Sequence, residues 1–157
     1  MRAAVLTVSD GCARGERTDE SGPHLGERLE GAGFEVVASE IVPDDPAAIR
    51  RALVRFADEL RVDVVLTTGG TGFSPRDTTP EATLAVVERR APGLVEALRA
   101  DGMKKTPRAC LSRGEAGLRG RTLIVNLPGS LKAVRDGVDF LLPILPHAVS
   151  MIGGEGH

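Results

Sequence analysis

The sequence contains no tryptophan and no tyrosine, and four phenylalanines are the only aromatic residues among its 157 positions. Aromatic rings are the usual stacking surfaces for the bases of single-stranded nucleic acid. The formal net charge is −2, so the protein also lacks the positive field that attracts DNA, RNA or acidic membranes. Both absences argue against nucleic acid as a partner. The hydrophobic core must be mostly aliphatic.

Cysteine is scarce, and long apolar runs are absent. Cys12 and Cys110 form no CxxC pair and have no histidine at metal-ligand spacing, which is typical of proteins from a reducing compartment. No stretch approaches the ~20 apolar residues of a membrane span, and the apolar run after Met1 is too short for a secretory signal. We expect a cytoplasmic protein that does not enter the membrane, folded as one domain over residues 1–157.

Several common catalytic motifs are missing as well. The glycines at 69–72 are not followed by GKS or GKT, and they do not fit the GxGxxG dinucleotide pattern. No GxSxG occurs. His24 and His147 lie within predicted helices, where surface or packing roles are expected, and the terminal His157 is expected to be disordered. Ordinary P-loop ATPases, NAD enzymes and Ser/His/Asp hydrolases are therefore disfavoured.

Apolar runs and helical periodicity divide the chain into alternating elements. Strands are predicted at 3–8, 34–42, 63–68 and 122–127. Helices are predicted at 24–31, 46–60, from about 80 to the Pro92-Gly93 break, and at 94–103, 131–142 and 145–152. Residues 12–21 read as a polar loop, and the segment 109–120 has no clear assignment.

Two helix starts carry capping signals. Asp45 followed by Pro46 predicts an N-cap and a first-turn proline for the helix at 46–60. The next helix allows two registers: Thr79 as N-cap with Pro80 at the first position, or a capping box of Thr78 with Glu81.

Strands that are almost continuously apolar belong to parallel sheets covered by helices on both faces. The predicted fold is therefore α/β: a three-layer αβα, doubly wound and mostly parallel sheet. Such sheets bind ligands beyond the carboxyl ends of their strands. Four polar clusters directly follow predicted strands: Ser9-Asp10, Asp44-Asp45, the glycine loop with Arg76-Asp77, and Asn126-Pro128-Gly129. We expect all four to meet at one edge of the sheet.

The glycine loop, Thr68-Gly69-Gly70-Thr71-Gly72, is the most informative of these clusters. Glycines let the backbone approach a ligand closely, and the N–H groups of such a loop favour bound anions such as phosphate. A tight turn between a strand and a helix, without a ligand, is the alternative. The acid and base that follow, Asp77 and Arg76, favour a site.

Carboxylates without a useful histidine point to phosphate chemistry assisted by a divalent cation, because Mg²⁺ prefers carboxylate and water oxygens. Asp44 and Asp77 are the candidate Mg²⁺ ligands. Helix capping is the alternative role for Asp44 and the expected role for Asp45. Asp10 could brace the loop, contact a nucleotide or cap a helix.

Two further clusters each allow two roles. Ser112 and Arg113, flanked by glycine, could clamp a phosphate or a polar ring, or could lie in a solvated loop. Pro128-Gly129-Ser130 could direct backbone N–H groups at an anion, or could form a simple turn.

Taken together, these motifs resemble the MogA/MoaB family of molybdenum cofactor biosynthesis proteins, whose domain also occurs in gephyrin and in a plant molybdopterin-synthesis fusion protein. The resemblance runs in order through LTVSD, VPDD, TTGGTGFSPRDTTPEAT, LSRGEAGLRG and NLPGSLKAV. It implies the molybdopterin-binding fold and a molybdopterin adenylyltransferase activity. In that reaction the terminal phosphate of molybdopterin attacks the α-phosphate of MgATP, giving adenylyl-molybdopterin and pyrophosphate.

Carried over by position, the resemblance implies catalytic roles for Asp44, Asp77 and Ser112, with Mg²⁺ held by the two aspartates. The predicted substrate-binding residues are Ser9, Asp10, Thr68, Gly69, Gly70, Thr71, Gly72, Arg76, Pro80, Glu81, Arg113, Asn126, Pro128, Gly129 and Ser130. The substrates are ATP and molybdopterin.

The resemblance also implies a homotrimer or homohexamer and transfer of the product to a molybdenum insertion protein. The short C-terminal end resembles the compact MoaB-like form. Two alternatives to the enzyme are a non-catalytic molybdopterin-binding carrier and an oligomeric scaffold of the gephyrin kind. The intact SPRDTTPEAT and LSR motifs favour the enzyme.

Overall fold

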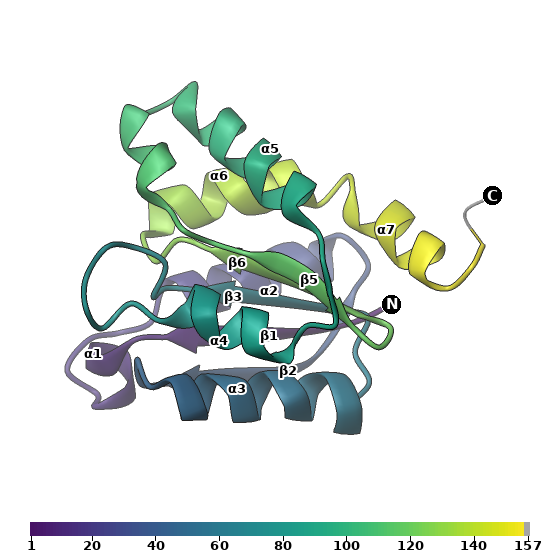
Figure 1. Ribbon diagram of the computed structural model, residues 1–157, viewed down its shortest axis with the longest axis horizontal. Coiled ribbons are helices and arrows are strands. Elements are labelled where there is room, and N and C mark those ends of the chain that lie inside the picture. The colour runs from purple at the N-terminus through teal and green to yellow at the C-terminus, as the bar shows by residue number, and fades with distance from the viewer. Residues whose placement is uncertain (156–157) are drawn as a thin grey trace.

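The structure is a computed structural model that describes residues 1–155, so His157 lies outside the described residues. Its centre is a six-stranded sheet in the order β2-β1-β3-β6-β5-β4 (Figure 1). The strands are β1 (Arg2–Val8), β2 (Glu35–Val42), β3 (Val64–Thr68), β4 (Arg89–Arg90), β5 (Ala116–Arg119) and β6 (Thr122–Leu127). Strands β2, β1, β3 and β6 are parallel neighbours, whereas β5 and β4 add an antiparallel edge.

Helices cover both faces of this sheet. The α-helices are α1 (Asp10–Ala13), α2 (Ser21–Gly31), α3 (Pro46–Val54), α4 (Thr79–Val86), α5 (Pro92–Met103), α6 (Leu131–Leu141) and α7 (Leu145–Ile152). Two short irregular helices are the π-helical η1 (Arg55–Glu59) and the 3₁₀-helical η2 (Pro107–Leu111). Figure 1 shows α5 and α6 above the sheet with α2 behind it, and α3 below the sheet with α4 in front. Helices α2, α5 and α6 pack on one face, and α3 and α4 pack on the other. The predicted three-layer, mostly parallel α/β fold is confirmed.

The apolar composition of the central strands explains the layers. Every residue of β3 and β6 is buried, as is all of β1 except Arg2. Alternate side chains of these strands enter two separate cores, because successive residues of a strand point to opposite faces. Val64 and Leu66 pack with α2, α5 and α6, while Val65 packs with α3 and α4.

Several element boundaries differ from the sequence prediction. The predicted loop at 12–21 includes the second half of the short helix α1, and α2 begins at Ser21 instead of residue 24. Asp19 explains the early start, because its carboxylate accepts the Gly22 N–H at 3.0 Å and the Thr7 hydroxyl at 2.7 Å. The predicted helix at 46–60 is α-helical only to Val54 and then widens into η1.

The region around Pro92 was also predicted incorrectly. The helix that starts near Pro80 ends at Val86, and the two-residue strand β4 separates it from α5. Pro92 does not break a helix but occupies the first turn of α5, where its missing N–H costs nothing. The unassigned segment 109–120 forms the end of η2 and strand β5, which pairs with β6 as an antiparallel hairpin.

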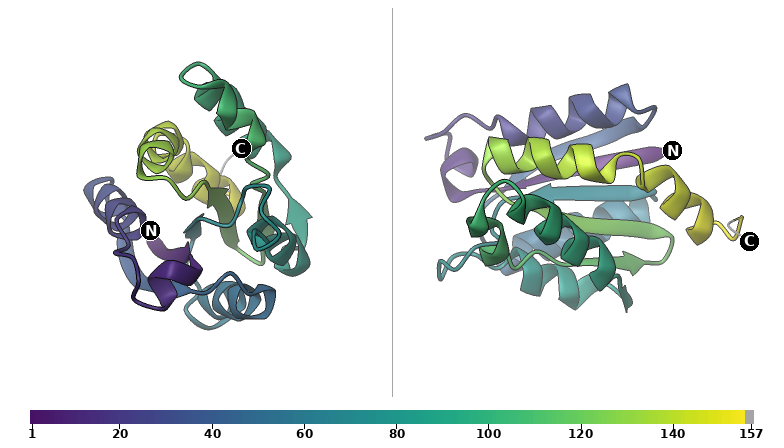
Figure 2. Two further views of the ribbon diagram at one scale, coloured as in Figure 1. Left: turned by 90° about the vertical axis from the view of Figure 1, so that its left-hand side faces the viewer. Right: turned by 90° about the horizontal axis from the view of Figure 1, so that it is seen from above.

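The carboxyl ends of the parallel strands face one edge of the molecule. Figure 1 shows α1 and the loop after β3 together at this edge, and the left view of Figure 2 looks directly onto it. Helix α7 lies at the opposite end, where both figures show it extending beyond the sheet. Within residues 1–155, none of the helices has the length and hydrophobicity required to cross a bilayer.

Candidate active site

The glycine loop after β3 forms the centre of the site, and two of its positions have a backbone conformation that favours glycine. Gly69 and Gly70 have positive φ angles of 95° and 68°, a region that favours glycine. Gly69 lies against β1, where an added Cβ would sit 2.2 Å from the Val8 carbonyl oxygen. Its own N–H donates to the Leu127 carbonyl of β6 at 3.2 Å. The loop therefore lies at the junction of β1, β3 and β6.

Two carboxylates flank this loop, one on each side. A Cβ on Gly70 would meet Asp44 Oδ1 at 3.2 Å, and a Cβ on Gly72 would meet Asp77 Oδ2 at 2.8 Å. At position 70 the Thr79 hydroxyl is closer still, at 2.3 Å, so a side chain there would meet both Thr79 and Asp44. Among the described residues, the N–H groups of Gly70, Thr71 and Gly72 have no hydrogen-bond acceptor. The loop offers these N–H donors to an anion between two negatively charged side chains.

A cavity of about 650 Å³ opens beside the loop. Nine of the predicted site residues line it: Gly70, Thr71, Gly72, Asp77, Ser112, Asn126, Pro128, Gly129 and Ser130. They come from the end of β6 and the segment after it, from the segment after β3, and from the segment between η2 and β5. Two of the four clusters predicted to meet at this edge, the glycine loop with Asp77 and Asn126-Pro128-Gly129, therefore line one cavity, whereas Ser9-Asp10 and Asp44-Asp45 lie outside its lining. The cavity is of a size typical for small-molecule sites.

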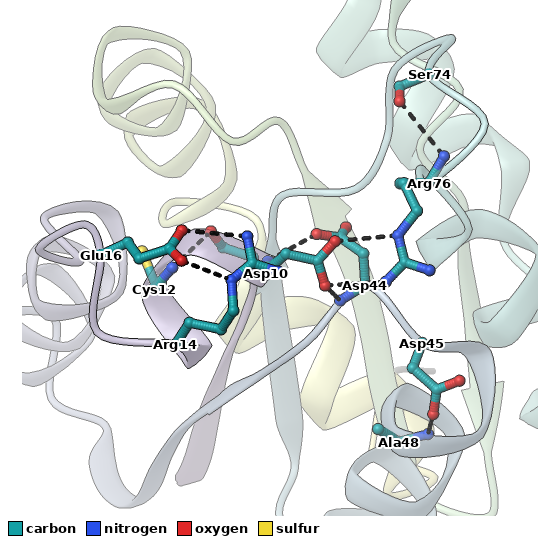
Figure 3. A network of polar contacts seen from close by, with 10 residues as sticks. Asp10, Cys12, Arg14, Glu16, Asp44, Asp45, Ala48, Ser74 and Arg76 are labelled. Carbon is teal, nitrogen blue, oxygen red and sulfur yellow. Dashed lines mark hydrogen bonds and ion pairs between the residues drawn. The ribbon is translucent and has the colours of Figure 1, made fainter.

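Asp10, Asp44 and Arg76 form a second group beside the cavity (Figure 3). Asp10 and Asp44 each donate a backbone N–H to the other's carboxylate, at 2.9 and 3.0 Å. Arg76 binds the Asp10 carboxylate through Nε and Nη2, both at 3.0 Å. Asp45, by contrast, accepts the Ala48 N–H at 2.9 Å and caps α3, so the predicted cap is confirmed and Asp44 is not the cap of that helix.

The two aspartates of this group differ in their electrostatics. Burial raises the pKa of Asp44, and the negative charges of Asp10 and Asp77 raise it further. The hydrogen bonds from Arg76 lower the pKa of Asp10. A cation beside Asp44 and Asp77 would relieve the repulsion between them. Two carboxylates beside a loop with unpaired N–H groups suit Mg²⁺, which usually binds one or two carboxylates together with substrate phosphates. The residues therefore fit a magnesium ion, although the described chain contains no cluster of three or more metal-binding side chains.

Arg113 binds the backbone of the glycine loop and does not face the cavity lining. Its backbone N–H donates to the Thr71 carbonyl, and its guanidinium donates to the carbonyls of Gly72 and Asp77, all at 2.8 Å. It also forms an ion pair with Glu81, which lowers the pKa of that carboxyl. These contacts brace the loop, and Arg113 does not line the cavity, whereas its neighbour Ser112 does. Substrate binding by Arg113 and Glu81 stays a prediction.

Asn126 reaches the cavity wall but is only 2% exposed. Its Nδ2 donates to the hydroxyls of Thr67 and Thr83 at 3.0 Å, and its Oδ1 accepts the Glu115 N–H at 3.1 Å. Every polar atom of this side chain therefore has a protein partner. Asn126 joins β6 to β3, to α4 and to the residue before β5.

The other predicted residues lie at the same edge in local contacts. Ser9 and Ser130 accept N–H groups as N-caps of α1 and α6. The Thr68 hydroxyl donates to the Pro128 carbonyl at 2.8 Å. Pro80 is buried in the first turn of α4.

Thr79 is not the N-cap that one register predicted, because it is the first helical residue and donates its hydroxyl to the Gly69 carbonyl at 2.9 Å. Thr78 occupies the cap position without a capping hydrogen bond.

The sequence reasoning missed three cationic residues of the cavity wall: Arg99, Arg108 and Lys132. Arg99 donates to the carbonyls of Ser112 and Gly114 at 3.2 and 3.0 Å and so positions that segment. Lys132 lies in the first turn of α6, directly after a strand end, and that position could have revealed it. No local signal marked Arg99 or Arg108, because α5 and η2 reach the site only through the tertiary fold.

Comparison with known proteins gives a consistent result. Residues 4–147 match the family described as "Probable molybdopterin binding domain". The molybdopterin adenylyltransferase of Helicobacter pylori strain J99 is 40% identical over 157 residues, covering 99% of this chain and 89% of that protein. The molybdenum cofactor synthesis protein cinnamon of Drosophila melanogaster is 45% identical over 153 residues, covering 96% of this chain.

The chain spans only 22–50% of the length of the longer curated relatives that it matches, including 25% of cinnamon. Among solved structures, the molybdopterin biosynthesis enzyme MoaB of Thermus thermophilus superposes with a TM-score of 0.92 at 52% identity. That match covers 98% of this chain and 96% of the other.

Proposed function

The chain belongs to the molybdopterin-binding domain family of molybdenum cofactor biosynthesis, and on this premise we propose that it is a molybdopterin adenylyltransferase. The observation that carries the proposal is the glycine loop, which presents N–H donors between Asp44 and Asp77 at the wall of a cavity of about 650 Å³. Such a site suits the joining of two phosphate-bearing substrates. ATP and molybdopterin are the proposed pair.

The proposed reaction is a substitution at phosphorus. An oxygen of the terminal phosphate of molybdopterin forms a bond to the α-phosphorus of ATP, and the bond from that phosphorus to the bridging oxygen breaks. The electron pair leaves with pyrophosphate. This chemistry needs positioning and charge stabilisation more than a protein nucleophile, in agreement with a site that has glycine N–H groups and carboxylates but no histidine.

The chain's own residues would divide these tasks. We propose that the N–H groups of the glycine loop bind phosphate oxygens and that Asp44 and Asp77 hold Mg²⁺, which supplies charge neutralisation on the phosphates. Ser112 lies beside the glycine loop, since its hydroxyl is 3.5 Å from the hydroxyl of Thr71. The apolar part of the cavity, with Val95 and Leu98, would receive the pterin.

The direct test is incubation with molybdopterin and MgATP, followed by detection of adenylyl-molybdopterin and pyrophosphate. Asp77→Ala should abolish transfer without unfolding the protein, because the Asp77 carboxylate makes one hydrogen bond, to the Ser74 N–H, in an exposed loop. Near-wild-type turnover of Asp77→Ala would remove Asp77 from the mechanism. Tight pterin binding without pyrophosphate release would instead identify a non-catalytic carrier.

We further propose a cytoplasmic homo-oligomer, a trimer or hexamer, that passes its product to a molybdenum insertion protein. Ile41 on the edge strand β2 and Met151 on α7 are 45% and 54% exposed, and such apolar side chains are available for contacts between copies. Light scattering coupled to gel filtration would give the number of subunits, and a monomer at micromolar concentration would contradict the proposal.

A further inference from the structure

Asp10 is the meeting point of three loops that follow three different strands. Its carboxylate accepts the N–H of Asp44, after β2, and two N–H groups of Arg76, after β3. Its own backbone N–H, after β1, donates to the Asp44 carboxylate. Figure 3 shows the contacts of Asp10 with both Asp44 and Arg76 as dashed lines. One side chain therefore links the loop of Asp44 to the loop that carries Asp77.

The reciprocal contact fixes the Asp44 side chain. Asp44 Oδ2 is held by a backbone N–H, which cannot rotate away, and Oδ1 then lies beside Gly70. Because the Asp44 N–H is in turn held by Asp10, a shift of either residue would move the other. The orientation of Asp44 toward the glycine loop thus depends on Asp10.

Arg76 connects Asp10 to the loop that carries Asp77. It is adjacent to Asp77 in sequence, and its planar guanidinium binds Asp10 in the two-point geometry that fixes orientation as well as distance. The Arg76 side chain is 63% exposed, so this ion pair contributes little to global stability. Its consequence is local: it ties the exposed loop at 73–77 to the end of β1.

The ion pair of Asp10 and Arg76 also affects the charge around the glycine loop. Asp10, Asp44 and Asp77 bring three negative charges to one edge of the sheet, and Arg76 neutralises the charge of Asp10. Asp44 and Asp77 then remain as the two uncompensated carboxylates beside Gly70 and Gly72. A site with two such carboxylates can hold one divalent cation with phosphates.

From this arrangement we propose that Asp10 and Arg76 are positioning residues: together they set the placement of Asp44 and Asp77 on either side of the glycine loop, without contacting the substrates themselves. The kinetic part of this inference rests on the proposed function, whereas the structural part stands without it.

The first test needs no substrate and uses hydrogen–deuterium exchange of the full chain. The amides of Ser74 and Asp77 are protected by hydrogen bonds within the loop, to the Asp77 carboxylate and the Ser74 carbonyl. Asp10→Asn and Arg76→Gln should each speed their exchange by about three- to tenfold. Arg14→Gln is the control, because the Arg14 side chain is as exposed as that of Arg76 and its ion pair with Glu16 spans only two residues. Unchanged exchange in Asp10→Asn and Arg76→Gln would overturn the proposal.

The second test is kinetic. Asp10→Asn and Arg76→Gln should each lower kcat by about ten- to a hundredfold while KM for MgATP changes less than about threefold. The double variant should be no slower than the slower single variant, since both remove the same connection. Arg76→Lys keeps the charge without the two-point contact and should recover only part of kcat.

The outcomes separate the possible failures. Additive losses with a large rise in KM would show that Asp10 or Arg76 contacts a substrate directly, and would overturn the positioning role. A wild-type protein without any transfer activity would contradict the proposed function alone, and the exchange result would then decide this inference.

Discussion

Gly69 lies against Val8 so closely that a Cβ at position 69 would sit 2.2 Å from the Val8 carbonyl oxygen. No real Cβ makes such a contact with a backbone atom, so alanine at this position would force β1 and the glycine loop apart. The positive φ of Gly69 adds a cost of about 1–2 kcal/mol for any other residue. We expect Gly69→Ala to lower the free energy of unfolding by about 3 kcal/mol or more, measured by urea denaturation.

Gly15 provides the matched control for this substitution. It also has a positive φ, 75°, but a Cβ there would meet nothing within 4 Å. Gly15→Ala should therefore show only the conformational cost, about 1–2 kcal/mol. Equal losses in the two variants would mean that the contact between Gly69 and Val8 relaxes freely.

The hydrogen bonds of Asn126 predict a role in stability. Asn126→Ala would leave the Glu115 N–H and the hydroxyls of Thr67 and Thr83 without their present partner in a buried region. We expect a loss of about 2–3 kcal/mol in the free energy of unfolding. Thr83→Val removes one of these partners and should cost about half as much. A loss below about 0.5 kcal/mol in Asn126→Ala would show that the network is not structural.

The raised pKa of Asp44 predicts a pH-dependent effect of Asp44→Asn. Because the folded protein holds the Asp44 proton more tightly than the unfolded chain, this group stabilises the fold at low pH, and that stability is lost as the pH rises through the raised pKa. Asparagine does not titrate. The stability of Asp44→Asn relative to wild type should therefore grow as the pH rises above 3.8, the ordinary value for aspartate. Urea denaturation from pH 4 to 8 would measure it, and a pH-independent difference would contradict the expectation.

Asp44→Asn should lower the activity, although it raises the relative stability at higher pH. Asp44→Asn should lower adenylyl transfer by about a hundredfold or more if Asp44 holds the cation. Asp45→Asn is the control, since Asp45 only caps α3 and asparagine is an equally good N-cap. Similar losses in the two variants would indicate that the α3 terminus, and not the Asp44 charge, matters for turnover.

Arg113→Lys tests whether the loop needs a planar guanidinium. A lysine ammonium keeps the charge but cannot reach the carbonyls of Gly72 and Asp77 together with Glu81. We expect a loss of about 1–2 kcal/mol in the free energy of unfolding and a fall of about tenfold in kcat. Arg50→Lys, on the exposed face of α3, is the control and should change neither quantity.

The strand ends show how much of the site could be predicted. The apolar runs at 3–8 and 122–127 gave the buried strands, and the polar residues directly after them had to appear at one edge because parallel strands share a direction. The Asp45 cap was likewise encoded within four residues. The antiparallel strand β5 was missed because its four residues carry no periodicity strong enough to distinguish a strand from a loop.

The sequence by itself determined the layers, the parallel strands and the placement of Asp44, Asp77 and the glycine loop at their carboxyl ends, because hydrophobic periodicity and capping are local properties. Only the tertiary structure decided which polar side chains from distant parts of the chain contact one another. Arg76 meets Asp10 across 66 positions, and Ser21 meets the Gly129 carbonyl across 108. Such partners depend on how the strands are ordered and on which loops meet at their ends, and no local pattern in the chain records either.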